Sequence, residues 1–115
     1  MDLCDSLFSQ YIVRSRGKCE IGGDWCDKET LQTSHNYSRS HKSIRFEEIN
    51  VLCLCDHHHR QYERMTAMER QALLESKLGF DRHQELLEMK NQVKHWYDHD
   101  LKILSQKLKM KLKEL

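Results

Sequence analysis

Hydrophobic and polar positions divide the chain into an amphipathic beginning, an irregular middle and a helical second half. In residues 2–16 the apolar side chains recur at the spacing of one helix face, which predicts an amphipathic helix. These positions are Leu3, Leu7, Phe8, Tyr11 and Ile12. From Gly17 to about Glu63 no long period is present, and the segment predicts loops with short strands. Because so small a segment cannot bury enough apolar surface on its own, we expect a metal ion to stabilise it.

Two helical patterns follow in the second half of the chain. Thr66 and Glu69 have the spacing of a capping box, so a helix is predicted over about 66–78, with Gly79 at its end. Asp81 can cap a second helix, which we predict as one long element over about 82–114. Its apolar stripe comprises Leu86, Met89, Val93, Trp96, Tyr97, Leu101, Leu104 and Leu108. The stripe advances in steps of three and four, as in a coiled coil, so it either packs on the chain's own core or forms a homodimer.

Cysteine and histidine are abundant, with five and eight copies in 115 residues. The number of cysteines is odd and histidines are interleaved with them, which favours metal binding over disulfides. No run of about 18 apolar residues is present, so no membrane span is predicted. The first ten residues carry two acidic and no basic side chains, unlike a secretory signal. We therefore expect a cytoplasmic location, in the host cytoplasm if a phage encodes the chain.

Charge is unevenly distributed, although the formal net charge is only +1. Residues 102–115 contain five lysines and one glutamate. Five arginines lie around the segment that is rich in cysteine and histidine: Arg14, Arg16, Arg39, Arg45 and Arg60. Such local basic patches are compatible with DNA binding but do not require it.

Four residues are candidate ligands of a structural zinc ion: Cys19, Cys26, Cys55 and His58. The first two enclose a pair of glycines that lets the chain fold back, and the last two form a C-x-x-H pair. A tetrahedral site with three cysteines and one histidine is within the known repertoire of zinc. Two neighbours, Cys53 and His57, could replace one of these ligands; otherwise Cys53 is expected to be a small buried hydrophobic residue.

Residues 33–59 resemble the motif of HNH (ββα-metal) endonucleases. They include most of the segment between the two ligand pairs and the second pair itself. The run Asn50-Val-Leu-Cys-Leu-Cys-Asp-His-His-His59 is similar to the family pattern N-x-x-x-L-C-x-x-C-H, with His58 in place of the second cysteine. The three residues that give the family its name would be His35, Asn50 and His59. Within the superfamily the chain is most similar to phage NinG/Rap recombination nucleases, over about residues 5–85. That likeness rests on the leading helix, Ser38-Arg39, Arg45-Phe-Glu-Glu48 and Lys77-Leu-Gly-Phe80.

This resemblance implies an α+β fold with a small treble-clef-like core that zinc holds together. The nuclease core with its N-terminal helix would occupy residues 1–65, and a helical extension would occupy 66–115. The implied activity is metal-dependent hydrolysis of phosphodiester bonds in DNA, during phage DNA recombination or processing. Branched or single-stranded DNA is the implied substrate.

The expected chemistry assigns a role to each polar residue of the motif. His35 would act as the general base, because imidazole titrates near neutral pH. A Mg²⁺ or Mn²⁺ ion held by His59 would bind the phosphate oxygens. Asn50 is uncharged and suits positioning of the loop near His35 by hydrogen bonds to the backbone. Two arginines, Arg39 and Arg45, offer guanidinium groups to phosphate.

The residue before the general base departs from the family pattern. Ser34 stands where an acidic residue or a histidine is usual, and serine is a poor ligand. Glu63 follows His59 by four residues, so both lie on one helix face and Glu63 could be the second ligand of the catalytic ion. Alternatively, Glu63 is a solvated carboxylate.

Two other functions fit parts of the sequence. The first is a non-catalytic zinc module that binds DNA or protein, and the second is a helical assembly protein that uses its C-terminal helix. His35 together with His59 favours the nuclease, because a binding module has no need of two histidines at one phosphate.

Overall fold

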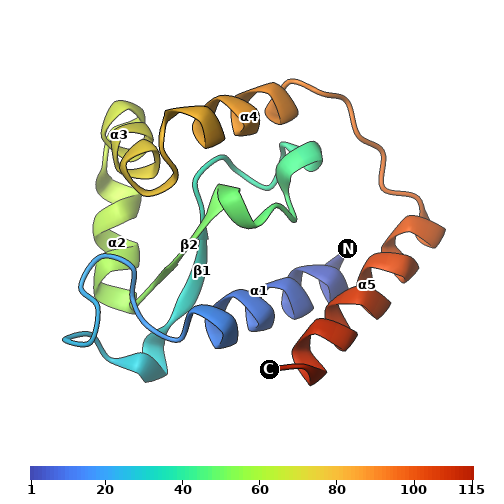
Figure 1. Ribbon diagram of the computed structural model, residues 1–115, viewed down its shortest axis with the longest axis horizontal. Helices are drawn as coiled ribbons and strands as arrows, with labels where there is room; N and C mark the ends of the chain where they lie inside the picture. The colour runs from blue at the N-terminus through green and yellow to red at the C-terminus, as the bar shows by residue number, and fades with distance from the viewer.

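The computed structural model describes residues 1–115 and contains five α-helices around a two-stranded sheet (Figure 1). The elements are α1 (Asp2–Arg16), β1 (Gln32–His35), β2 (Val51–Leu54), α2 (Asp56–Arg64), α3 (Ala67–Leu78), α4 (Phe80–Lys90) and α5 (Asp98–Lys113). Short 3₁₀ turns lie at Lys28–Thr30, Lys42–Ile44 and Glu48–Asn50. The fold is therefore α+β, as predicted. No helix combines the length and the apolar character that crossing a membrane requires.

Helix α1 has the bounds that the apolar spacing predicted. Its buried side chains fall on one face, at Cys4, Leu7, Phe8 and Ile12. The helix ends at Gly17, whose φ of 70° is in the left-handed region that glycine adopts without strain. The pattern of apolar residues thus predicted the extent of α1 and most of the face that it buries, but Leu3 is exposed and Cys4 is buried.

The two strands pair antiparallel, and β2 is buried on both of its faces. The register places His35 opposite Val51. Val51 and Cys53 pack with α1, whereas Leu52 and Leu54 pack with Tyr62 of α2. Since successive side chains of a strand point to opposite faces, burial of both faces accounts for an uninterrupted apolar run. The sheet is thus enclosed between α1 and α2.

The start and the end of α3 confirm the predicted capping signals. Thr66 and Glu69 form a reciprocal capping box, with both hydrogen bonds at 3.1 Å. Gly79 ends the helix with a φ of 84° and is followed directly by α4. Helices α3 and α4 pack together, and Leu74 of α3 and Leu86 of α4 form an apolar cluster with Ile44 of the 3₁₀ turn at 42–44.

The predicted single helix over about 82–114 is wrong. Helix α4 begins at Phe80, before the proposed cap Asp81, and it ends at Lys90, so residues 91–97 separate it from α5. Within this segment the Trp96 indole N–H donates a hydrogen bond of 2.9 Å to the Lys42 carbonyl. Its ring also packs edge-on against Phe46, with the centroids 5.2 Å apart. These tertiary contacts hold the segment in a non-helical path.

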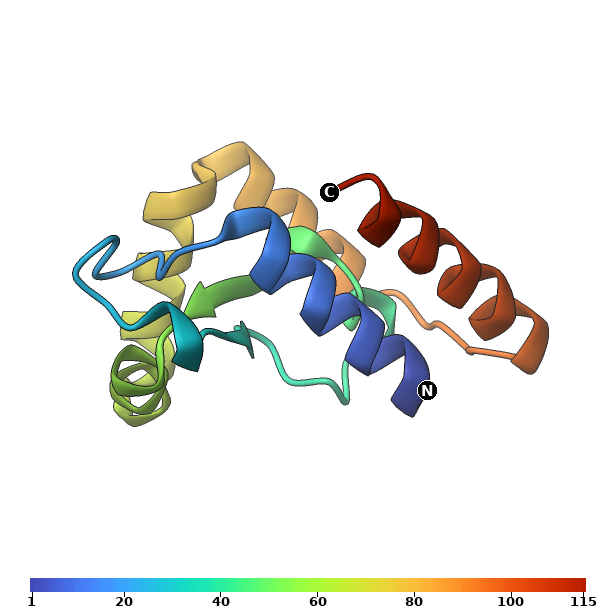
Figure 2. The ribbon, with the colours of Figure 1, turned by 90° about the horizontal axis from the view of Figure 1, so that it is seen from below.

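Helix α5 lies along α1 and runs in the same direction (Figures 1 and 2). Near its start the Cys4 thiol donates to the Leu101 carbonyl at 3.3 Å, and near its end the Lys111 ammonium lies 5.2 Å from the Tyr11 ring centroid. Leu108 completes the apolar cluster of α1 and β2. The C-terminal part of the predicted stripe therefore packs on the chain's own core, and residues 66–115 do not extend away from the first part of the chain.

Candidate active site and metal centre

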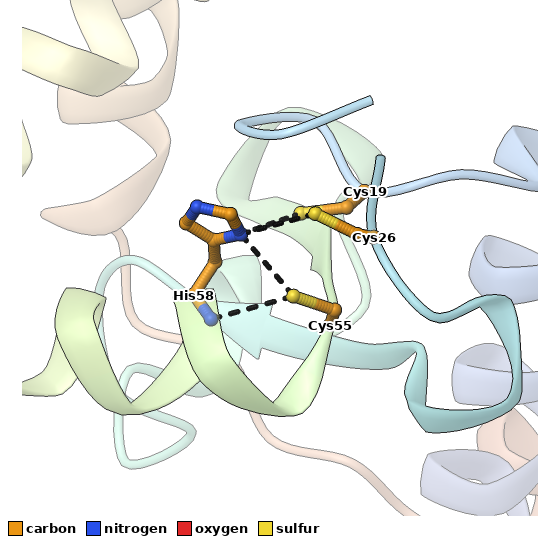
Figure 3. A group of neighbouring side chains, drawn as sticks. All are labelled: Cys19, Cys26, Cys55 and His58. Atoms are coloured by element: carbon orange, nitrogen blue, oxygen red, sulfur yellow. Dashed lines mark hydrogen bonds between the residues drawn. The ribbon is translucent and has the colours of Figure 1, made fainter. Parts of the chain in front are cut away.

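Three cysteines and one histidine converge on one point, and they are the predicted zinc ligands (Figure 3). The four ligand atoms of Cys19, Cys26, Cys55 and His58 all lie within 4.8 Å of one another. The histidine Nδ1 is 3.2 to 3.5 Å from the three sulfurs. Tetrahedral zinc with ordinary bond lengths would separate sulfur and nitrogen ligands by about 3.6 Å. The cluster therefore fits a structural zinc ion in both chemistry and size.

The loop after α1 brings two of the cysteines into the cluster, and its glycines make this possible. The Gly23 N–H donates to the Cys19 carbonyl at 2.8 Å, and Gly23 has a φ of 63°. A methyl group added at Gly22 would lie 2.2 Å from the sulfur of Cys26 and 2.6 Å from Cε1 of His58. The first glycine is thus required by close approach and the second by backbone conformation.

The other two ligands lie at the start of α2. Cys55 is the N-cap residue, and its sulfur accepts a hydrogen bond of 3.4 Å from the His58 N–H. A helix N-terminus favours negative charge, so this position suits a thiolate. The helical turn carries His58 back toward the sulfur, which is the geometry that the C-x-x-H spacing requires.

Two of the cluster thiols, Cys19 and Cys26, have pKa values shifted in opposite directions. Burial and the neighbouring sulfurs raise the pKa of Cys26 to about 12. Burial also acts to raise the pKa of Cys19, but hydrogen bonds from backbone N–H groups, including that of Gly22, outweigh it and lower that pKa. A divalent ion would supply the positive charge that three thiolates need.

The two alternative ligands lie outside the cluster. Cys53 is fully buried between β2 and α1, and burial raises its pKa to about 11. His57 is exposed, although it is adjacent to His58. The open choice is therefore settled in favour of Cys55 and His58, and Cys53 is the buried hydrophobic residue that was predicted.

A polar cleft of about 480 Å³ lies between β1, α1 and α2. Its lining includes His35 and, from α2, His59 and Glu63. Two of the three residues of the proposed motif thus face one cleft. The third, Asn50, is fully buried beneath it.

His35 is the last residue of β1 and has the properties of a proton acceptor. Its Nε2–H donates to the Arg45 carbonyl at 3.0 Å, and because a carbonyl can only accept, the lone pair of the neutral ring is on Nδ1. Nδ1 has no hydrogen-bond partner within the protein. Burial lowers the pKa of His35 below its ordinary value, so the ring is neutral at neutral pH.

His59 is held between two side chains of the cleft. Its Nδ1 lies 2.5 Å from the Ser34 hydroxyl, and its Nε2 lies 2.9 Å from a carboxylate oxygen of Glu63. Adjacent ligands on an octahedral Mg²⁺ ion are about 3.0 Å apart, since each bond is 2.0–2.1 Å long. The pair His59 and Glu63 therefore has the spacing of two metal ligands. The Ser34 hydroxyl can accept a hydrogen bond from Nδ1–H, and in that tautomer Nε2 carries no proton and can bind a metal ion.

Asn50 ties the loop after β1 to the start of β2. Its Nδ2 donates to the carbonyls of Tyr37 and Ile44 at 3.1 and 3.2 Å, and its Oδ1 accepts from the Tyr37 N–H at 3.0 Å. All partners are backbone groups, so Asn50 shapes the segment that follows His35.

The guanidinium of Arg45, which was predicted to bind phosphate, is engaged in an ion pair within the protein. Its guanidinium forms a bidentate ion pair with Asp5 of α1, with contacts of 2.9 and 2.5 Å. Burial acts to raise the pKa of Asp5, but the hydrogen bonds and charge of Arg45 outweigh it and lower that pKa. Arg39 remains exposed at the cleft, 3.9 Å from the same carboxylate. Sequence reasoning missed Asp5, because forty residues separate it from its partner.

No family model, curated protein or solved structure matches this chain.

Proposed function

We propose that the protein is a metal-dependent DNA endonuclease of the HNH type. The observation that carries this proposal is the shared cleft, which a neutral His35 lines together with a histidine–carboxylate pair that has metal-ligand spacing. His59 directly follows the cluster residue His58 in α2. A structural zinc ion would therefore fix the position of the histidine that binds the catalytic ion.

In this proposal each side chain has a defined task during hydrolysis. His35 Nδ1 takes a proton from the attacking water as the new P–O bond forms and the bond to the leaving oxygen breaks. A Mg²⁺ or Mn²⁺ ion bound by His59 and Glu63 would supply charge stabilisation at the phosphate. Arg39 offers its guanidinium to a phosphate oxygen at the rim of the cleft. The leaving oxygen takes a proton from solvent, and the proton on His35 is then released to solvent.

The polarity of the cleft supports a charged substrate. Only one of its twelve lining residues is hydrophobic. Together with the resemblance to phage recombination nucleases, this favours branched or single-stranded DNA as the substrate and phage DNA recombination or processing as the role.

We also propose that the protein forms a homodimer through the outer face of α5. Ile103 and Met110 are half or more exposed and lie seven residues, or about two helical turns, apart. Light scattering that gives the mass of a single chain at all concentrations would refute the dimer.

A second candidate function is a zinc module that binds a partner without catalysis. It is favoured by Trp25, which lies in the loop between the first two cysteines and is 98% exposed. Tryptophan is enriched at protein interfaces.

Cleavage assays distinguish the two functions. Purified protein is incubated with supercoiled plasmid, a synthetic four-way junction or a single-stranded oligonucleotide, with Mg²⁺, with Mn²⁺ or without added divalent ion. We expect cleavage that requires the added ion and that His35→Ala lowers by about 100-fold. His95→Ala is the matched control, because His95 is exposed and does not line the cleft. Cleavage by His35→Ala at the native rate would reject the catalytic assignment and favour the binding module.

A further inference from the structure

A second hollow continues the cleft on the far side of the loop that follows β1. It has a volume of about 290 Å³ and shares two lining residues with the cleft, Ser38 and Arg70. The other lining residues are Asn36, Tyr37, His41, Ala67 and Gln71, so no carboxylate faces the hollow. The two hollows therefore adjoin at Ser38 and Arg70, and the second hollow is lined only by neutral and basic groups.

Arg70 stands where the two hollows meet, and its charge is not neutralised. No Asp or Glu oxygen lies within 4.0 Å of its guanidinium, in contrast to Arg45. The guanidinium carbon lies 5.8 Å from the centroid of the Tyr62 ring. Contact with an aromatic ring restrains the side chain without using its N–H donors in an ion pair. Arg70 is thus positioned to bind an anion.

Asn36 supplies a second donor to the same hollow. Its side chain is 8% exposed, and its Oδ1 accepts a hydrogen bond from the Tyr62 hydroxyl. The Nδ2 group has no hydrogen-bond partner in the protein, and Asn36 lines the hollow. A buried amide fixed at one end with its donor end open indicates a site for an acceptor.

We propose that this second hollow binds a phosphate group of the nucleic-acid strand, next to the phosphate that is cleaved, through Arg70 and Asn36. The inference rests on the proposed function, since it takes the strand as the source of the phosphate. A phosphodiester group only accepts hydrogen bonds and is negatively charged, which matches a guanidinium and an amide N–H₂ in a hollow without carboxylates. The strand would therefore pass over the loop after β1, from the cleft toward His41.

Binding measured without any added divalent ion tests this subsite separately from cleavage. A short labelled single-stranded oligonucleotide is titrated with zinc-loaded protein at several salt concentrations. We expect Arg70→Ala to weaken binding by about tenfold or more, because hydrogen bonds to charged groups are lost. The slope of log K against log salt should also fall by about 0.7, the value of one phosphate contact on a single strand. Arg70→Lys should keep most of the slope but lose part of the affinity.

Arg64→Ala is the matched control, because it removes the same charge from an exposed position that lines neither hollow. Asn36→Asp keeps an acceptor for the Tyr62 hydroxyl but replaces the donor by a carboxylate, and it should weaken binding without loss of zinc. If the slope of log K against log salt were the same for Arg70→Ala and the native protein, the subsite would be overturned even if the protein cleaves DNA. The subsite would also be overturned if inorganic phosphate displaced the labelled strand as well as the same concentration of unlabelled oligonucleotide does, since the site would then bind a free anion. Binding that depends on Arg70 without any cleavage would support the subsite and refute the nuclease.

Discussion

Replacing Gly22 with alanine tests the metal centre without changing any ligand. The added methyl carbon would lie 2.2 Å from the sulfur of Cys26 and 2.6 Å from Cε1 of His58, whereas ordinary contacts begin at 3.4 Å. The sulfur would therefore have to move by more than about 1 Å, while zinc–ligand distances tolerate only about 0.2 Å. We expect Cys26 to leave the site in Gly22→Ala.

The loss of one thiolate should be large enough to measure directly. Removing a group that only supports a ligand already weakens metal binding by about 10- to 100-fold. We therefore expect the zinc affinity of Gly22→Ala to fall by at least about 100-fold. Because folding and zinc binding are coupled at a structural site, the helical circular-dichroism signal should fall with the zinc content.

Gly23→Ala is the matched control for this experiment. Gly23 lies in the same loop with a φ of 63°, but nothing lies within 4 Å of an added methyl carbon. Its cost is limited to the left-handed conformation, about 1–2 kcal/mol. Both variants are dialysed against a graded series of chelator concentrations, and zinc per chain is measured by elemental analysis. Equal retention of zinc by Gly22→Ala and the native protein would refute the assigned cluster.

Three further outcomes are expected. Since burial lowers the pKa of His35 from its ordinary 6.5, the rate of metal-dependent cleavage should be constant near neutral pH and should fall only below pH 6.5; a decline that begins above pH 7 would contradict this assignment. Ser34→Ala should weaken Mn²⁺ binding to the zinc-loaded protein by about 10- to 100-fold in calorimetry, and Ser34→Thr should restore it, because the hydroxyl orients His59; unchanged affinity would exclude this role. Asp5→Asn should lower the free energy of unfolding at pH 7 by about 1.5–3 kcal/mol, since Arg45 loses a charged partner. The folded-state pKa of Asp5 is lowered, so the stabilisation by its carboxylate is complete above the ordinary pKa of 3.8 and is lost as pH falls through the folded-state pKa. If urea unfolding showed the same loss of stability in Asp5→Asn at pH 7 and at pH 2, this account of the ion pair would be disproved.

Local signals predicted those helices whose ends are encoded by nearby residues. The spacing of apolar residues gave α1, and the pair Thr66 and Glu69 with Gly79 gave α3. The interruption between α4 and α5 has no such signal, because residues 91–97 contain neither proline nor glycine. It arises from the contact of Trp96 with Lys42, which is 54 positions earlier in the chain. Tertiary contacts of this kind override helical periodicity and cannot be deduced from a window of sequence.

The candidate site was predictable to the extent that ligand chemistry restricts residue types. Zinc accepts few kinds of side chain, so the convergence of the two cysteine and histidine pairs could be deduced from their spacing. The contact of Ser34 with His59 depends on how β1 packs on α2, and the ion pair of Asp5 with Arg45 depends on how α1 lies beside the cleft. The sequence contained these residues but no pattern that links them.

The pairing of α1 with α5 determines when during synthesis the molecule can become complete. Leu108 covers the same apolar cluster as Phe8, so the ribosome delivers one partner about a hundred residues before the other. Until α5 emerges, the face of α1 that holds Phe8 stays partly uncovered and is a target for chaperones. The same helix contributes Asp5 to the cleft. Under the proposed function, the cleft would therefore reach its final geometry only after translation has passed α5.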